Sequence, residues 1–227
     1  MKISFLLMSR SRPVLFEKCL SLLLSKCRNH EGIEIICRLD SDDPFLRQYL
    51  DLRAGWLTFI VGSRMYGYQS FGTMIDQCAR LSTGDLLWQW GDDAQMVTDG
   101  YDVIVEDSVK QSAKSIFVLS SQLTSNLAAG NYPFGFFAIP RKLYELSKSF
   151  SLGQSFGYDR CYDALAKYYD CEVKSGVCLN HEYQFDQVAK EGIDKVSERL
   201  ENGREAYFSA WDEVGRLLAQ EIKGMEK

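Results

Sequence analysis

The sequence predicts an α/β protein with a mostly parallel central sheet flanked by helices, and a helical extension at its C-terminal end. Short apolar runs alternate along the chain with segments whose apolar residues recur every three or four positions, which is the pattern of a sheet covered by helices. Polar or acidic clusters directly follow several of these runs. The chain has 227 residues, 46% of them hydrophobic and 25% charged, a composition that fits one folded domain and excludes a disordered chain.

Strands and helices are predicted to alternate through the first half of the chain. Apolar runs predict strands at residues 2–8, 33–39, 57–61 and 85–90. Pro13 opens a helix after the first strand, and residues 71–79 place apolar side chains on one helical face after the third strand. Thr98 is a suitable N-cap for a further helix that ends near residue 112.

The second half of the chain is predicted to continue with shorter elements. Strands are expected at residues 115–120, 135–139 and 173–178, with helices at residues 141–149 and from residue 158. From about residue 187 onward the chain is helical and charged. We therefore expect a core domain over residues 1–185 and a helical extension over residues 186–227 that packs on the core or on a partner, such as a second copy of the chain.

The charge balance bears on the class of partner. The net charge is −5, which argues against a general nucleic-acid binder because such proteins use Lys and Arg to displace counterions from phosphate. Local basic sites remain, at Arg10 and Arg12 after the first strand and at Arg64 in a glycine- and tyrosine-rich segment.

The sequence also bears on location and redox state. The longest uncharged apolar run, residues 3–8, is far shorter than the roughly 20 residues that span a bilayer. It also lacks the form of a secretory signal, so we expect a cytoplasmic protein without a membrane span. The seven cysteines are odd in number and form no C-x-x-C pair, and we expect them to be reduced residues of the core.

Three polar clusters fall at the carboxyl ends of predicted strands, where open α/β sheets bind ligands. They are Ser9 to Arg12, Asp40 to Asp43, and Asp92-Asp93. Gathered carboxylates repel one another unless a cation or a hydrogen-bonded ligand compensates them, and Mg²⁺ or Mn²⁺ with substrate phosphates is the natural candidate. Each acidic cluster also has a plainer interpretation as a solvated turn, which is less expected for Asp92-Asp93 because a very apolar strand precedes it.

The order of these clusters resembles the GT-A nucleotide-sugar glycosyltransferases, in particular the inverting, family 2-like members. The resemblance covers about residues 1–185. It rests on the start at Ser9 to Pro13, on Asp40 to Asp43, and on the segment from Ala79 through Gly84-Asp85 to Asp92-Asp93. It implies the GT-A fold and a metal-dependent, hexosyltransferase-type enzyme that moves a sugar from a nucleoside-diphosphate sugar, with UDP-sugar favoured, to a hydroxyl acceptor such as a glycan.

The resemblance also implies a metal site. Family members end the fourth strand with a D-x-D motif that holds Mn²⁺ or Mg²⁺ on the donor diphosphate. Here the motif reads Gly91-Asp92-Asp93, which makes Asp93 the expected metal ligand and places Asp92 at the sugar or ribose. Because family members often supply a late histidine to the metal, His181 is the expected second ligand.

A nucleotide-sugar subsite is implied in the same way. Asp40 would accept a hydrogen bond from the base, and Arg10 and Arg12 lie where base or phosphate contacts are made. The aromatic residues of 66–68 either line the donor pocket or are ordinary packing. The residues expected to contact the nucleotide sugar are Ser9, Arg10, Arg12, Asp40, Asp43, Arg64, Tyr68 and Asp92.

A general base is implied at the start of a late helix, where inverting family members often carry Glu-Asp. Gly157-Tyr158-Asp159 matches in position, with Tyr158 in place of the Glu. Asp159 is therefore the expected base that deprotonates the acceptor hydroxyl. Its plainer interpretation is a first-turn aspartate stabilised by the helix dipole.

Two other functions are compatible with a metal-binding α/β sheet. A nucleotidyltransferase should show a glycine-rich loop with a lysine after the first strand, whereas Ser9 to Arg12 contains no glycine. A binding module would keep nucleotide-sugar affinity without turnover. Asp159→Asn separates that module from an enzyme, because only in an enzyme does the substitution abolish transfer while donor affinity is retained.

Overall fold

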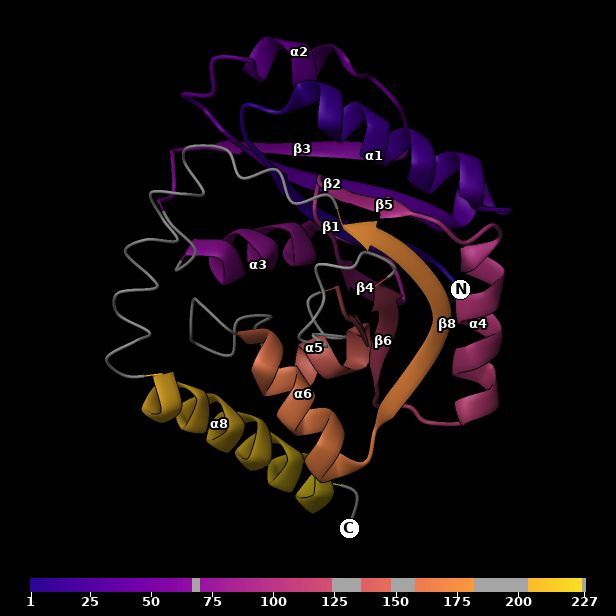
Figure 1. Ribbon diagram of the computed structural model, residues 1–227, viewed down its shortest axis with the longest axis vertical. Coiled ribbons are helices and arrows are strands. Elements are labelled where there is room, and N and C mark those ends of the chain that lie inside the picture. Colours follow the sequence, from indigo (N-terminus) through magenta and orange to yellow (C-terminus); the bar gives the residue numbers. More distant parts are fainter. Residues whose placement is uncertain (67–69, 124–135, 148–157, 182–203, 226–227) are drawn as a thin grey trace.

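The computed structural model of the chain describes residues 1–66, 70–123, 136–147, 158–181 and 204–225 (Figure 1), with the backbone alone described at residues 123, 158–160 and 204–211. The described strands form one sheet of eight in the order β3-β2-β1-β4-β7-β6-β8-β5. The strands are β1 (Ile3–Ser9), β2 (Ile33–Asp40), β3 (Leu57–Gly62), β4 (Leu86–Gln89), β5 (Ala94–Met96), β6 (Val118–Leu123), β7 (Ala138–Pro140) and β8 (Glu172–His181). The helices are α1 (Pro13–Lys26), α2 (Leu46–Asp51), α3 (Phe71–Leu81), α4 (Tyr101–Ser112), α5 (Arg141–Ser147), α6 (Tyr158–Tyr169) and α8 (Arg204–Met225), with a 3-10 turn at His30–Gly32.

The first half of the sheet is parallel, as the alternation of elements predicts. β1 lies between β2 and β4 and runs parallel to both, and β3 extends the parallel set beyond β2. The second half is mixed, because β7 runs antiparallel to β4 and β6, whereas β8 runs parallel to β6 and antiparallel to β5. The parallel half therefore brings the carboxyl ends of β1, β2 and β4 to one edge.

Alternate residues of the central strand β1 are buried in two separate hydrophobic cores. Phe5 and Leu7 of β1 belong to the cluster under α1, α2 and α4, whereas Leu6 belongs to the cluster under α3, α5, α6 and α8. Because successive side chains of a strand point to opposite faces, a strand covered on both faces is apolar throughout. Figure 1 shows α3, α5, α6 and α8 together on one side of the sheet.

The C-terminal helix α8 packs on α6. Leu218, Ala219 and Ile222 are buried in the same core cluster as the residues of α6. At Gly215 the two helices approach so closely that an added Cβ would lie 2.4 Å from the carbonyl oxygen of Cys161 and 2.7 Å from Cβ of Ala164. Only glycine allows this approach without a shift of the backbone.

The connection before α4 differs from the prediction. Thr98 is not an N-cap, because α4 begins at Tyr101 and its N-cap is Gly100, which has a left-handed backbone with φ of 66°. The Thr98 hydroxyl instead accepts a hydrogen bond of 2.7 Å from the Cys178 backbone N–H. The side chain that was expected to start the helix therefore ties the β5–α4 connection to β8.

The other differences concern short elements and one long strand. Neither α2 nor β5 was predicted, because their lengths of six and three residues are too short to show a periodic pattern. β8 has ten residues and extends to His181, beyond the predicted end at residue 178. None of the seven cysteines forms a disulfide, and six are buried, as expected, whereas Cys178 is partly exposed. None of the described helices combines the length and the apolar composition needed to cross a membrane.

A half-buried polar network joins the amino ends of β1, β2 and β4. The Glu34 carboxylate accepts hydrogen bonds from the Ser4 hydroxyl and from the backbone N–H groups of Thr83 and Gly84, and it pairs with Lys2 at 2.8 Å. Burial acts to raise the pKa of Glu34, but the bonds from Lys2, Ser4 and Thr83 outweigh it and lower the pKa from 4.5 to about 2. The network therefore requires the ionised carboxylate.

Acid should weaken this network over a defined pH range. Because the folded-state pKa is depressed, the stabilisation by Glu34 is present above pH 4.5 and is lost as the pH falls towards 2. Glu34→Gln is expected to lower the free energy of unfolding by about 1–2 kcal/mol at pH 6, an amount that allows for solvent screening at a half-buried site. Urea unfolding at pH 6 and pH 3 should show the gap to wild type narrowing at pH 3. Glu31→Gln, at an exposed glutamate, is the control, and an unchanged gap would contradict the assignment.

Candidate functional site

The three predicted clusters meet at the carboxyl edge of the parallel strands. β1 ends at Ser9, β2 ends at Asp40, and the turn after β4 carries Asp92 and Asp93. β8 adds His181, which is paired in register with Ala94 of β5. The structure thus brings together side chains from positions as far apart as 9 and 181, at the edge where open α/β sheets bind ligands.

A chain of hydrogen bonds fixes the loop after β1. The Arg12 backbone N–H donates to the Tyr49 hydroxyl at 2.9 Å, the Tyr49 and Ser9 hydroxyls lie 2.8 Å apart, and Ser9 donates to Asp92 Oδ2 at 2.6 Å. Since the Ser9 proton faces Asp92, the Tyr49 proton faces Ser9. Burial raises the pKa of Tyr49 to about 12, which keeps this hydroxyl a neutral donor. Tyr49 was not predicted, because it lies in the short helix α2 and resembles any other core aromatic residue.

Asp43 supports the same loop from the β2 side. Its Oδ2 accepts the Ser11 backbone N–H and its Oδ1 accepts the Phe45 backbone N–H, each at 2.8 Å. Ser11 has a φ of 58°, in the left-handed region that non-glycine residues rarely adopt. The buried Asp43 carboxylate therefore holds a strained turn between Arg10 and Arg12.

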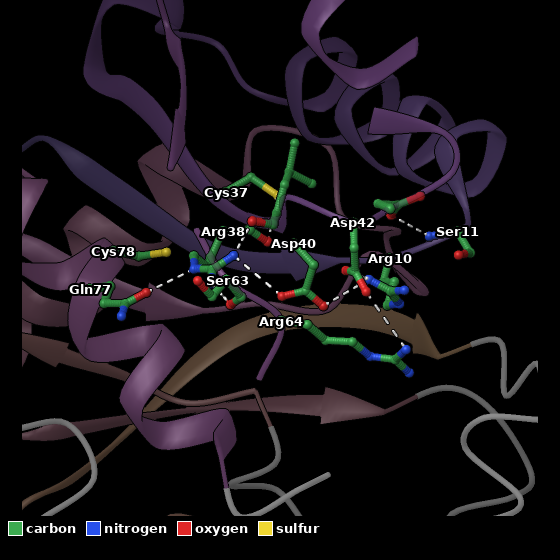
Figure 2. Close-up of polar contacts among 12 residues, drawn as sticks. Arg10, Ser11, Cys37, Arg38, Asp40, Asp42, Ser63, Arg64, Gln77 and Cys78 are labelled. Carbon is green, nitrogen blue, oxygen red and sulfur yellow. Dashed lines mark hydrogen bonds and ion pairs between the residues drawn. The ribbon is translucent and has the colours of Figure 1, made fainter. Parts of the chain in front are cut away.

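Asp40 lies between two arginines (Figure 2). Nη1 of Arg10 is 3.1 Å from Oδ2 of Asp40, and Nη1 of Arg38 is 3.4 Å from Oδ1. Arg10 also pairs with Asp42 at 2.6 Å, and Arg64 approaches the other oxygen of Asp42 at 3.8 Å. The predicted residues Arg10, Asp40 and Arg64 are therefore neighbours in one ionic cluster.

Arg38 is a second residue of the site, after Tyr49, that was not predicted from the sequence. It lies within the apolar strand β2 and is 3% exposed, where an alternating pattern predicts only core packing. Its guanidinium donates to the carbonyl oxygens of Leu39 and Ser63 and to Oε1 of Gln77 (Figure 2). It thereby fixes the end of β2, the end of β3 and helix α3 relative to Asp40.

Gly62 is required by this buried arginine. An added Cβ at Gly62 would lie 2.9 Å from Nη2 and 3.2 Å from Cζ of Arg38. The guanidinium is held by the bonds described above and has little room to shift. The glycine at the end of β3, directly before the segment that carries Arg64, is the available sequence signal for Arg38.

Asp92 and Asp93 differ in exposure and in partners. Asp92 is 1% exposed, and its carboxylate pairs with Nη2 of Arg12 at 2.6 Å in addition to the bond from Ser9. Asp93 is more accessible; its Oδ1 lies 3.2 Å from Nε2 of His181, and its Oδ2 lies 3.5 Å from Nη1 of Arg12. Burial acts to raise the pKa of Asp93, but His181 and Arg12 outweigh it and hold the pKa below its ordinary value. Asp93 therefore offers an ionised and partly accessible carboxylate.

The Asp93–His181 pair fits a divalent cation shared with a substrate. No group of three or more His, Cys, Asp or Glu side chains placed to hold a metal occurs among the described residues. Mg²⁺ and Mn²⁺ commonly bind one or two protein ligands and complete their shell with phosphate oxygens and water. Adjacent ligands of such an octahedral ion lie about 3 Å apart, and Oδ1 of Asp93 is 3.2 Å from Nε2 of His181.

Two predicted site residues cannot be placed in the site. Tyr68 lies outside the described residues, and Asp159 is described only by its backbone, as the second residue of α6. The other predicted residues lie in two groups, one around Asp40 and one around Asp92 and Asp93, except for Asp43, whose carboxylate holds the turn between them.

Comparison with known proteins identifies the fold. No family model and no curated protein matches the chain. Among solved structures, the chain is similar to the mannosyltransferase PcManGT from Pyrobaculum calidifontis in complex with GDP-Man and Mn²⁺, with a TM-score of 0.65 and 12% identity over 96% of this chain and 69% of that one. It is also similar to S. aureus TarS 1-349 in complex with UDP, with a TM-score of 0.61 and 10% identity.

The match to TarS covers 77% of this chain and 57% of that one. A second TarS structure, in complex with UDP-GlcNAc, gives the same TM-score of 0.61 over 83% of this chain and 60% of that one. The chain therefore spans less than two thirds of the TarS structures that it matches. These likenesses confirm the GT-A type of α/β fold that the sequence predicted.

Loss of Arg38 should destabilise the fold. Arg38→Met leaves the Ser63 and Leu39 carbonyl oxygens and one oxygen of Asp40 without their buried donor, and we expect the free energy of unfolding to fall by about 3 kcal/mol. Arg47→Met is the matched control, because the Arg47 side chain is 88% exposed and its pairing with Asp51 contributes less than about 1 kcal/mol. Urea unfolding of both variants measures the difference, and equal losses would contradict the role of Arg38.

Proposed function

We propose that the chain is a nucleotide-sugar glycosyltransferase that moves a sugar from a nucleoside-diphosphate sugar to a hydroxyl acceptor with inversion, and that UDP-sugar is the favoured donor. The observation that carries the proposal is the ionised Asp93 beside His181, at the ligand-binding edge of a fold shared with a mannosyltransferase crystallised with GDP-Man and Mn²⁺. In this proposal residues 1–185 form the catalytic domain, and residues 186–227 form an extension whose helix α8 packs on α6.

The ionic cluster around Asp40 is the proposed site for the nucleotide. Arg10 and Arg38 engage one oxygen each of the Asp40 carboxylate, which fixes its orientation as an acceptor for an N–H group of the base. The Arg64 guanidinium stacks 4.4 Å from the ring centroid of Tyr66, and the ring is largely exposed. This pair supplies a positive charge and an aromatic face beside Asp42, which shares Arg10 with Asp40. Tyr68, two residues further on, remains a proposed contact of the nucleotide sugar.

The turn after β4 is the proposed site for the diphosphate. Asp93 and His181 would hold Mn²⁺ or Mg²⁺, which supplies positive charge against the leaving nucleoside diphosphate when bound. Arg12 adds a fixed guanidinium suited to phosphate oxygens. Asp92 stays a proposed contact of the sugar or ribose, and its carboxylate also faces Ser9 and Arg12. We therefore assign it the further role of holding Arg12 in place.

Asp159 is the proposed general base. It is the second residue of α6, where the positive end of the helix dipole favours a carboxylate. The carboxylate would take the proton of the acceptor hydroxyl while the hydroxyl oxygen bonds to the anomeric carbon. The bond from that carbon to the diphosphate breaks on the opposite side, and the nucleoside diphosphate leaves with the electron pair.

Nucleotide binding tests the donor site. Wild type is expected to melt about 5–11 °C higher with one of UDP, GDP, CDP or dTDP plus Mn²⁺, when the nucleotide is present at about 100 times its dissociation constant. Asp93→Ala should remove the part of this shift that depends on Mn²⁺. Asp99→Ala is the control, because Asp99 is exposed and pairs only with Lys26 among its described partners. Absence of any nucleotide-dependent shift in wild type would refute the proposed function.

Substitution of the base separates catalysis from binding. Asp159→Asn should lower kcat by about 10²–10⁴-fold, the usual contribution of a general base, with donor affinity within about threefold of wild type because the base contacts only the acceptor proton. Asp163→Asn, one helical turn further on at an exposed position, should keep kcat near the wild-type value. Transfer is measured as nucleoside diphosphate released in the presence of acceptor. Unchanged kcat in Asp159→Asn would exclude it as the base, and a wild type that binds but never turns over would indicate a binding module.

A further inference from the structure

Arg12 spans both carboxylates of the turn after β4, but it does so unequally. Nη2 lies 2.6 Å from Oδ1 of the buried Asp92, whereas Nη1 lies 3.5 Å from Oδ2 of the more accessible Asp93. The Arg12 side chain is 26% exposed, so it is partly accessible to solvent. The contact with Asp92 is thus a close ion pair, and the contact with Asp93 is a loose one.

The backbone of Arg12 is fixed by hydrogen bonds that do not involve Asp93. Its N–H donates to the Tyr49 hydroxyl at 2.9 Å, and its carbonyl oxygen accepts the Phe16 N–H at 3.0 Å. The preceding Ser11 is held by Asp43. The guanidinium can therefore give up Asp93 while it keeps Asp92 and the loop stays in place.

A divalent cation and Arg12 would draw on the same carboxylate. The proposed metal ligands, Oδ1 of Asp93 and Nε2 of His181, are 3.2 Å apart, and the guanidinium pairs with the second oxygen of Asp93. An ion bound there would lie close to the positive charge of the Arg12 guanidinium in a partly buried site, where like charges repel strongly. A diphosphate would offset this repulsion, because its oxygens can coordinate the ion and accept hydrogen bonds from the guanidinium at the same time.

We propose that Arg12 is an internal counter-cation that makes divalent-cation binding at Asp93 and His181 conditional on a diphosphate. This inference rests on the proposed function, since it concerns the same donor site. Without the diphosphate, Arg12 neutralises the acidic pair and the ion binds weakly. With the diphosphate, Arg12 turns to phosphate and Asp93 becomes available, so that the two ligands strengthen each other's binding by the same factor.

Mn²⁺ binding to the wild-type chain is the first test. Free Mn²⁺ is measured by electron paramagnetic resonance, with and without UDP, after subtraction of the Mn²⁺–UDP complex that forms in buffer. We expect UDP to tighten Mn²⁺ binding by at least about tenfold, a factor within the usual range of coupling between sites. Uridine, which carries no phosphate, should have no effect. Equal Mn²⁺ affinity with and without UDP would overturn the inference.

Removal of the guanidinium is the second test. Arg12→Gln should bind Mn²⁺ without UDP about tenfold more tightly than wild type, and the effect of UDP should shrink correspondingly. Arg47→Gln is the control: it removes the same charge from a side chain that is 88% exposed and pairs with Asp51, outside the proposed site. A similar rise in Mn²⁺ affinity in both variants would show that the effect comes from the net charge of the protein, and it would overturn the specific role of Arg12.

A third variant covers the case in which Arg12→Gln does not fold, because the substitution leaves Asp92 buried without its cation. Arg12→Lys keeps a charge for Asp92, but one ammonium group cannot span both carboxylates as a guanidinium does. It should therefore bind Mn²⁺ without UDP more tightly than wild type, and an unchanged affinity would count against the inference.

A UDP-dependent rise in melting temperature with no coupling to Mn²⁺ would overturn the inference and leave the proposed function standing. Failure of every nucleotide and of Mn²⁺ to bind would overturn both.

Discussion

The buried carboxylate of Asp92 is the constraint on which the site depends. A charge that is 1% exposed must be compensated by the protein, and here Ser9 and Arg12 provide the compensation. Ser9 is in turn held by Tyr49, so that one charge after β4 fixes the end of β1, the start of α1 and helix α2. The more accessible neighbour Asp93, which pairs with His181 and more loosely with Arg12, lies on this fixed support.

The site has two parts, which lie on either side of the loop after β1. Around Asp40, arginines from the loop after β1, from β2 and from the segment after β3 surround two carboxylates, an arrangement suited to a polar ring with a fixed orientation. Around Asp93, one arginine and one histidine face a single accessible carboxylate, an arrangement suited to phosphate and a metal ion. The strained turn at Ser11 joins the two parts.

The sequence predicted the strand ends and the clusters behind them because both follow from local patterns. Apolar runs mark β1, β2 and β4, and polar residues follow directly where each strand leaves the core. Tyr49 and Arg38 were missed because their roles depend on partners distant in sequence, such as Ser9 and Ser63. Thr98 was assigned to a helix start on a local preference that a long-range bond to Cys178 overrides. The antiparallel pairing of β7 likewise has no local signal.

The burial of most cysteine thiols allows selective chemical labelling of the chain without substitutions. Six of the seven cysteines are buried, and burial raises the pKa of those at positions 19, 27, 37, 78 and 171, so their reactive thiolate forms are scarce at neutral pH. Cys178 alone is partly exposed, and it lies in β8 three residues before His181. A thiol-directed fluorophore or spin label would therefore attach first at the strand that carries His181, and it would report on that strand without any engineered cysteine.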